Sequence, residues 1–174
     1  EVVVVVTDRE DVGGIERAAE AGLKTTVLVR RDYASAGDWS DAAFGVCRDA
    51  GADLVVLAGF LSLVEVPEDF GLRVLNIHPS LIPAFCGQGF YGERVHRAAI
   101  ERGVRVSGCS VHLVDNQYDH GPIILQKTVP VLGDDSPESL ADRVFEAECE
   151  AYPEAIGLLA DGRLSLVAGR LLID

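Results

Sequence analysis

Apolar residues in the first part of the chain occur in short runs separated by polar segments. Val2–Thr7, Thr25–Val29 and Leu54–Ala58 are such runs, and a continuous apolar run of this kind predicts a buried strand. Two stretches with helical spacing, Ile15–Ala21 and Asp41–Ala50, lie between the runs, and a glycine follows each of them, as at many helix ends. Strand, helix and strand within about thirty residues form a βαβ unit, which predicts a parallel sheet.

The remainder of the chain predicts a strand, a hairpin and a long helix. Val74–His78 is a fourth apolar run, Ser110–Val114 alternates between polar and apolar residues, and Ile123–Leu132 returns as the second strand of a hairpin. Ser136 precedes a proline, a pair that marks the start of a helix, and the helical pattern continues to Leu159. Two short apolar runs near the C-terminus predict a final hairpin.

These elements predict one α/β domain, residues 1–174, with a Rossmann-like architecture. We expect a mostly parallel central sheet flanked by helices, with a C-terminal hairpin. Residues 1–75 make up a βαβ half of the kind that binds nucleotides, and residues 76–174 make up the second half. A chain of 174 residues is long enough to bury a substantial core as a single domain.

The composition narrows the range of partners. The formal net charge is -13, and an acidic surface repels phosphate backbones, so we expect no nucleic-acid partner. No apolar run is long enough to cross a bilayer and the first residues lack a basic leader, so we expect no membrane partner and no signal peptide. Four widely spaced cysteines without a C-x-x-C motif favour reduced thiols and a cytoplasmic location.

Two polar side chains leave the carboxyl end of the fourth predicted strand. Asn76 and His78 are two residues apart, so a strand directs both to one face, and Pro79 then ends the strand. In open α/β sheets, ligands bind at the carboxyl ends of the strands. An amide donor beside an imidazole that can carry charge suits the stabilisation of an oxyanion at a carbonyl carbon. The alternative is that both side chains only satisfy backbone groups of the following loop.

Four more residues are candidates by position. Asp119 closes a polar turn, and Ser110 and His112 share one face of the preceding strand. Glu148 falls in line with core residues of the long helix, where a carboxylate needs a partner or a ligand. Each also has an ordinary structural interpretation: a hairpin acid, half-buried strand residues, and a carboxylate at the edge of the apolar stripe. The histidines show no paired close spacing, so we expect no metal.

Three motifs taken together resemble a known family. They are Asn76-x-His78-Pro79-Ser80-Leu81-x-Pro83, Ser110-Val111-His112 and Asp119-x-Gly121-Pro122-Ile123-Ile124-x-Gln126. The set resembles the 10-formyltetrahydrofolate-dependent formyltransferases, and the resemblance covers nearly the whole chain. Within that family the chain looks most like the enzymes of purine biosynthesis that formylate the amine of glycinamide ribonucleotide.

The resemblance implies direct formyl transfer through a tetrahedral intermediate, with small-molecule substrates, 10-formyltetrahydrofolate as co-substrate and no metal. It assigns Asn76, His78 and Asp119 to the catalytic trio. Asn76 donates to the formyl oxygen, and His78 as an imidazolium stabilises the intermediate. Asp119 keeps His78 charged and relays, through water, the proton that leaves the amine.

The same resemblance implies binding residues in the second half of the chain and just before it. Substrate contacts are expected from Asn76, Ser80 and Glu148, and a supporting role from Ser110 and His112. Residues 76–174 thereby become the catalytic and folate-binding half. The folate is expected to contact eight residues: Phe60, Leu61, Leu63, Val64, Val114, Asp115, Tyr118 and Asp119.

The chain departs from the family pattern in two places. The family opens with a further strand and a loop that grips the substrate phosphate, and both are expected to be absent, because this chain begins one strand later. The segment 86–92 is longer than in the simplest members, and we expect it to reshape the cavity entrance.

These departures leave alternatives open. The acceptor could be a sugar amine, the chain could hydrolyse 10-formyltetrahydrofolate to formate, or it could be a truncated protein that binds folate without turnover. Homodimerisation through a sheet edge that the missing strand would expose is a further expectation.

Overall fold

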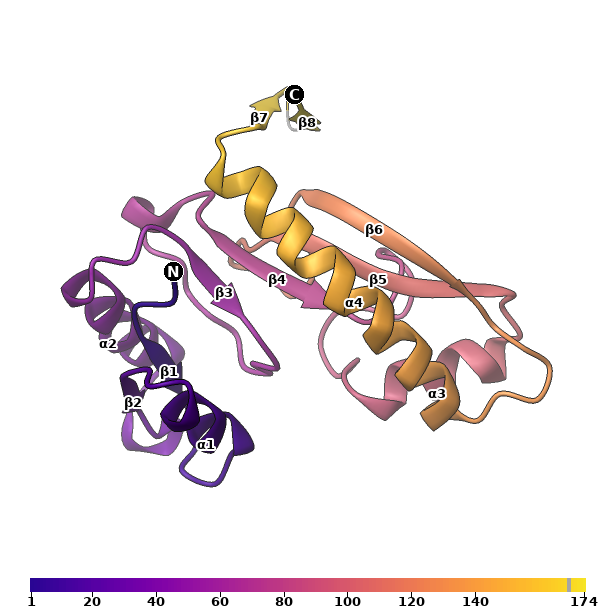
Figure 1. Ribbon diagram of the computed structural model, residues 1–174, viewed down its shortest axis with the longest axis horizontal. Helices are drawn as coiled ribbons and strands as arrows, with labels where there is room; N and C mark the ends of the chain where they lie inside the picture. Colours follow the sequence, from indigo (N-terminus) through magenta and orange to yellow (C-terminus); the bar gives the residue numbers. More distant parts are fainter. Residues whose placement is uncertain (169) are drawn as a thin grey trace.

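The computed structural model describes residues 1–168 and 170–174 (Figure 1). In chain order the elements are β1 (Val5–Thr7), α1 (Gly13–Glu20), β2 (Thr25–Val27), η1 (Arg30–Asp32), α2 (Ala36–Asp49), β3 (Val55–Leu57), η2 (Glu68–Phe70), β4 (Val74–His78), α3 (Glu93–Arg102), β5 (Val106–Leu113), β6 (Ile123–Pro130), α4 (Pro137–Ala160), β7 (Leu164–Val167) and β8 (Arg170–Ile173).

In the described residues the strands form three sheets. β1 pairs with β2 in parallel, β7 pairs with β8 in antiparallel, and the central sheet has the order β3-β4-β5-β6. In the central sheet β3 and β4 are parallel, whereas β4–β5 and β5–β6 are antiparallel. The predicted α/β class, with helices flanking a sheet and a C-terminal hairpin, is confirmed. The central sheet is mixed and not mostly parallel as predicted: in the described residues one of its strand pairings is parallel and two are antiparallel, because β5 and β6 form a hairpin beside β4.

The first two strands are shorter and less covered than the sequence predicts. The run Val2–Thr7 forms a strand over Val5–Thr7 alone, and Val2 and Val3 are exposed. In the described part of the chain β1 pairs only with β2. A strand is regular only as far as a neighbour pairs with it, so this three-residue ladder begins at Val5, opposite the first residue of β2.

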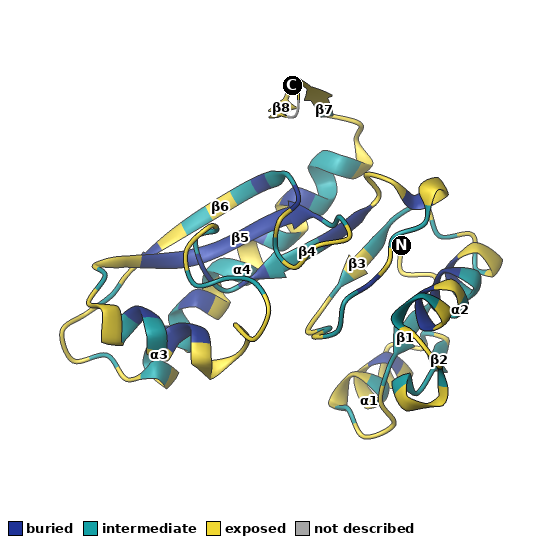
Figure 2. Cartoon of the chain, turned by 180° about the vertical axis from the view of Figure 1, so that it is seen from behind, coloured by how far each residue is buried: buried dark blue, intermediate teal, exposed yellow. Residues whose placement is uncertain are grey.

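Helix α4 lies across one face of the central sheet (Figure 1). Its residues Leu140, Val144 and Ala151 are buried in one apolar cluster with Val111 of β5, which is buried along most of its length (Figure 2). The helix begins at the predicted cap, Ser136, whose hydroxyl accepts a hydrogen bond from the backbone of the third helical residue. The polar residues of β4 and β5 therefore face the opposite side of the sheet.

A second apolar cluster joins helix α2 to the strands on either side of it. It contains Trp39 and Phe44 of α2, Val6 of β1 and Val55 of β3. Helix α2 begins at Ala36, five residues before the predicted start, because the hydroxyl of Ser35 caps it.

The predicted boundary between the two halves, after residue 75, falls inside β4. In the described residues, no helix is both long enough and apolar enough to span a membrane.

Candidate active site

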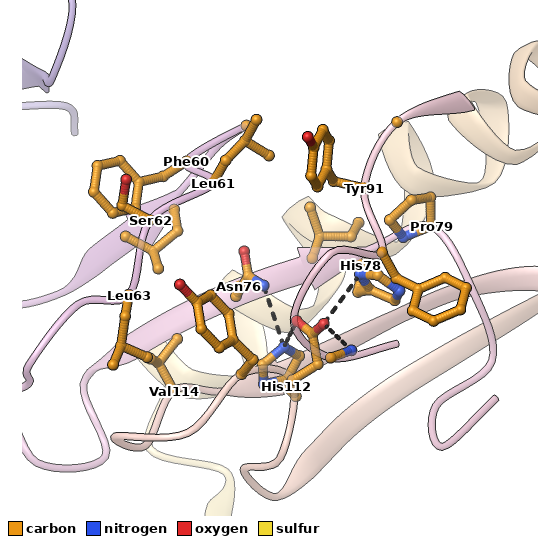
Figure 3. Close-up of a pocket in the computed structure, with 18 of the residues that line it drawn as sticks. Phe60, Leu61, Ser62, Leu63, Asn76, His78, Pro79, Tyr91, His112 and Val114 are labelled. Atoms are coloured by element: carbon orange, nitrogen blue, oxygen red, sulfur yellow. Dashed lines mark hydrogen bonds and ion pairs between the residues drawn. The ribbon is translucent and has the colours of Figure 1, made fainter. Parts of the chain in front are cut away.

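The carboxyl end of β4 places Asn76 and His78 on the same face of the central sheet. In the antiparallel register of β4 and β5, Asn76 lies opposite His112 and His78 lies opposite Ser110. The strand alternation that was read from the sequence thus brings all four polar side chains to the face that α4 does not cover. Figure 3 shows Asn76, His78 and His112 converging from these strands.

His78 is held between two oxygen atoms. Its Nε2 donates to the backbone oxygen of Phe85 at 2.9 Å, and its Nδ1 lies 3.5 Å from Oδ2 of Asp119. The side chain is buried, and burial lowers the pKa of its imidazole, while the Asp119 carboxylate and the Phe85 carbonyl act in the opposite direction. Both ring nitrogens therefore face an oxygen that can accept a hydrogen bond from the charged form.

Asp119 comes to His78 from a turn. Its backbone has a φ of 50°, in the left-handed region, which lets the turn direct its carboxylate towards the strand ends. Oδ2 accepts a hydrogen bond from the backbone N–H of Gly87 at 2.8 Å. Burial acts to raise the pKa of the carboxyl, but the neighbouring charge of His78 and this N–H are among the contacts that lower it below its usual value. Asp119 is thus ionised at neutral pH, although little of it is exposed.

His112 completes the group. It is buried in β5, its Nδ1 lies 2.8 Å from the backbone oxygen of Leu113, and its Nε2 lies 3.3 Å from Nδ2 of Asn76. The same Nε2 is 3.7 Å from Oδ1 of Asp119. The structure therefore brings together the three predicted catalytic residues and one predicted supporting residue.

These side chains lie at the base of a cavity of about 430 Å³. The remaining predicted folate contacts line it as well, and Figure 3 shows Phe60, Leu61, Leu63 and Val114 on the side opposite His78. The eight predicted folate residues in the lining are Phe60, Leu61, Leu63, Val64, Val114, Asp115, Tyr118 and Asp119.

Helix α2 and the 115–120 turn hold the segment that carries this apolar lining. Trp39 of α2 stacks on Phe60, with ring centroids 4.8 Å apart, and its indole N–H donates to the backbone oxygen of Leu28. The backbone N–H of Val66 donates to the side-chain oxygen of Asn116 at 2.9 Å. An apolar slot beside fixed polar groups is the usual form of a site for a flat aromatic ligand.

Helix α4 contributes the third side of the cavity. Ala141, Phe145 and Glu148 face it at intervals of four and three residues, as one face of a helix requires. Glu148 is half-buried, and desolvation raises the pKa of its carboxyl to about 7. The predicted position of Glu148 at the site is thus matched by the structure, and the side chain gains or loses its proton near neutral pH.

Ser80 and Ser110 lie outside the cavity lining. Both are fully buried. The Ser80 hydroxyl donates to the backbone oxygen of Ala84, and the Ser110 hydroxyl donates to that of Ser80 and accepts from Gln126. The Ser80 hydroxyl holds the loop that follows β4, and the substrate contact of Ser80 stays a prediction.

The cavity also has lining residues that the sequence reasoning did not assign. His96 of α3 is buried, and its Nδ1 has no hydrogen-bond partner among residues 1–168 and 170–174. Phe145 is exposed at the rim. Spacing offers a weak signal for each, since His96 adjoins the core residue Val95 and Phe145 lies three residues, about one turn, before Glu148. The loop after β4 adds Gly87, Gly89, Phe90, Tyr91 and Gly92.

The arrangement suits stabilisation of a negative charge next to an electrophilic carbon. An amide, an imidazole and a carboxylate converge from β4 and one turn, beside an apolar slot and a titratable carboxyl. In the described part of the chain no group of three His, Cys, Asp or Glu residues could hold a metal ion. The side chains themselves offer donors and proton carriers for an acyl transfer.

Comparison with known sequences matches this chain to one family over most of its length. The profile of the family described as formyl transferase matches residues 1–156. A chloroplastic phosphoribosylglycinamide formyltransferase of Arabidopsis thaliana is 41% identical over 167 residues, which are 94% of this chain and 57% of the relative. A trifunctional purine biosynthetic protein adenosine-3 of Gallus gallus is 38% identical over 95% of this chain and 16% of its own length. The chain thus spans little more than half of the first relative and a sixth of the second.

Solved structures of similar proteins have the same fold as this chain. Glycinamide ribonucleotide transformylase 1 from Symbiobacterium toebii is 44% identical and superimposes with a TM-score of 0.92, over 99% of this chain and 80% of the other. The phosphoribosylglycinamide formyltransferase of Anaplasma phagocytophilum is 34% identical, with a TM-score of 0.86 over 99% of this chain and 81% of its own.

Proposed function

Because the chain belongs to the formyl transferase family, we propose that it transfers the formyl group of 10-formyltetrahydrofolate to the amine of glycinamide ribonucleotide. The observation that carries the proposal is the convergence of Asn76, His78 and Asp119 at one end of the cavity. The names of the similar proteins supply the acceptor of the proposal, and the folate co-substrate comes from the resemblance of the motifs to the family.

In the proposed reaction the acceptor amine attacks the formyl carbon, and the carbonyl oxygen becomes an oxyanion. Asn76 donates an N–H to this oxygen, and His78 in its charged form stabilises it. The amine nitrogen then loses a proton, the bond between the formyl carbon and N10 of the folate breaks, and N10 gains a proton.

Asp119 is proposed to offset the effect of burial on His78. Burial lowers the pKa of the imidazole, so a charged His78 needs the carboxylate beside it, 3.5 Å from Nδ1. The lowered pKa of Asp119 keeps this carboxylate ionised at the pH where the amine is to react. The same carboxylate can pass the departing proton through water to N10.

We place the pterin of the folate in the apolar slot between Phe60–Val64 and the turn that carries Asp119. Its ring would lie against side chains held by the Trp39–Phe60 stack. The acceptor then approaches from α4, where Glu148 can accept a hydrogen bond from the glycinamide group. This assignment puts the formyl carbon between the two substrates, next to Asn76.

The test is a product assay on the purified chain with 10-formyltetrahydrofolate and three acceptors: glycinamide ribonucleotide, a sugar amine and water. We expect formylglycinamide ribonucleotide as the product, and its formation should stop in the Asn76→Ala variant. Formylation of the sugar amine alone, or release of formate without acceptor, would replace the proposal by one of these activities. Calorimetric binding of a folate analogue without any turnover would indicate a binding protein.

Two further predictions accompany this function. A cytoplasmic location is supported by the four cysteines, none of which is in a disulfide. Homodimerisation through a sheet edge is testable by sedimentation, in which a monomer at all concentrations would contradict it.

A further inference from the structure

His112 lies beside the reacting group without being one of the three proposed catalytic residues. It stands directly opposite Asn76 in the β4–β5 register and is only 2% exposed. The register of β5 with β6 shifts between Val111 and His112, an irregularity of the kind that re-aims side chains next to active sites. A buried imidazole in this place must have its two ring nitrogens satisfied.

The first ring nitrogen identifies the tautomer. Nδ1 of His112 lies 2.8 Å from the backbone oxygen of Leu113. A carbonyl oxygen can only accept, so Nδ1 carries the hydrogen. A neutral imidazole has one N–H, which leaves Nε2 bare, with a lone pair that needs a donor.

The second ring nitrogen finds its donor in Asn76. Nδ2 of Asn76 lies 3.3 Å from Nε2, whereas Oδ1 of Asp119 is 3.7 Å away and beyond hydrogen-bond length. The other carboxylate oxygen of Asp119, Oδ2, accepts from the backbone N–H of Gly87. The bare nitrogen therefore accepts from the amide, and the orientation of the Asn76 carboxamide follows from the tautomer of His112.

We propose that His112 is a positioning residue for formyl transfer: its Nε2 accepts one N–H of Asn76 and thereby turns the second N–H and the oxygen of that amide towards the cavity. Figure 3 shows the Asn76 oxygen directed away from His112. The amide then offers a donor to the formyl oxygen and an acceptor to an N–H of the attacking amine. Without His112 the carboxamide can rotate and exchange the two groups. The inference rests on the function proposed above.

The covalent structure of histidine provides a matched pair of variants. Nε2 is three bonds from Cβ, as is the amide oxygen of glutamine, whereas Nδ1 is two bonds from Cβ, as is that of asparagine. His112→Gln can thus keep a hydrogen-bond acceptor near Asn76. His112→Asn places its amide near the backbone oxygen of Leu113 and leaves no acceptor near Asn76. We expect His112→Asn to lower kcat by about 10²-fold with KM for the folate unchanged, since misplacing a reacting group by 1 Å costs about that much. His112→Gln should recover most of the loss.

A double-mutant cycle with Asn76 separates positioning from other roles. If His112 acts through Asn76, then His112→Asn costs nothing further in the Asn76→Ala background. Equal losses in the Gln and Asn variants, full additivity in the cycle, or a loss in KM alone would overturn the proposal. Thermal unfolding of each variant is measured alongside, because a variant that melts early cannot report on kcat.

Nitrogen NMR of the unmodified protein, with labelled histidine, tests the tautomer without a variant. Protonated and bare ring nitrogens differ widely in chemical shift, and we expect a protonated Nδ1 and a bare Nε2 for His112. A protonated Nε2 would overturn the proposal, since Asn76 would then have to turn its oxygen to His112. If the unmodified chain forms no product, the proposed function is contradicted. The NMR measurement still decides the tautomer of His112 in that case, because it does not depend on turnover.

Discussion

Asn76 and His112 occupy adjacent strands, whereas Asp119 occupies a turn, and the two settings differ in how the side chain is held. The two strand residues are partners in one pairing of the β4–β5 ladder, so the backbone hydrogen bonds of that ladder define their positions. Asp119 depends on a left-handed backbone and on one hydrogen bond from Gly87. The groups proposed to meet the formyl oxygen are thus on the rigid side of the cavity.

The same contrast extends to the two binding surfaces. Glu148 and Phe145 stand on α4, a helix of 24 residues packed across the sheet. The proposed pterin slot is built from segments that single contacts join, such as the Val66–Asn116 hydrogen bond and the Trp39–Phe60 stack. Strands and helices therefore fix the reacting groups, while loops shape the space for the larger ligand.

The largest effect should come from removing a donor on the rigid side. Asn76→Ala deletes the amide but leaves the ladder hydrogen bonds of β4 in place, because these belong to the backbone. We expect kcat to fall by about 10²–10³-fold, as for loss of one oxyanion donor, with little change in melting temperature. Steady-state kinetics and thermal unfolding check this. A large drop in stability would mean that the strand depends on the side chain, contrary to the contrast drawn above.

A smaller effect is expected from a backbone change on the loop side. A Cβ added at Gly121 would lie 1.9 Å from the backbone oxygen of Leu113, so Gly121→Ala must displace the turn that carries Asp119 two residues earlier. We expect kcat to fall by about 10²-fold or less and the free energy of unfolding to decrease by about 1–3 kcal/mol. Gly133→Ala is the matched control, since nothing lies within 4 Å of its added Cβ. Unchanged activity in Gly121→Ala would show that Asp119 tolerates displacement.

The smallest effect concerns Glu148 and appears in stability as a function of pH. The carboxyl has a pKa of about 7 in the folded chain, raised from 4.5 by burial, so the folded state binds this proton more tightly. The contribution of this carboxyl to stability is therefore fully present below about pH 4.5 and is lost as the pH rises to about 7. Glu148→Gln should remove this fall and gain on the order of 1–2 kcal/mol relative to the unmodified chain at about pH 8, after allowing for solvent screening.

Denaturant unfolding of both proteins across this pH range measures the difference. The control is Glu146→Gln, which changes an exposed glutamate of the same helix. A constant difference between Glu148→Gln and the unmodified chain at every pH would contradict the assignment of the raised pKa.

Residues on regular elements could be placed from the sequence, and those in loops could not. Alternation along the strands put Asn76, His78 and His112 on one face, and helical spacing put Glu148 with the core, as the structure has them. Asp119 came from its motif, since no periodicity states where a turn residue points. Ser80 was placed at the site by the motif that begins at Asn76, and its hydroxyl donates to the backbone oxygen of Ala84.

The lengths of the strands and the additional lining residues could not be predicted from the sequence, because both depend on contacts between distant segments. Whether Val2–Val4 join a strand depends on a neighbouring ladder, which is a long-range property that a local run of valines does not contain. His96 and Phe145 are ordinary members of helical patterns, and only the packing of α3 and α4 brings them to the cavity.

The separation of the β1–β2 ladder from the central sheet has a consequence for how the molecule opens. Three residue pairs hold this ladder, and α2 links it to β3 through side chains alone in the described residues. Its amide hydrogens should exchange with solvent deuterium as a cooperative unit of low stability, ahead of those in β4, β5 and β6. Opening of this unit leaves the pairing of β4 with β5 intact, so Asn76 and His112 keep their positions while the first two strands are unfolded.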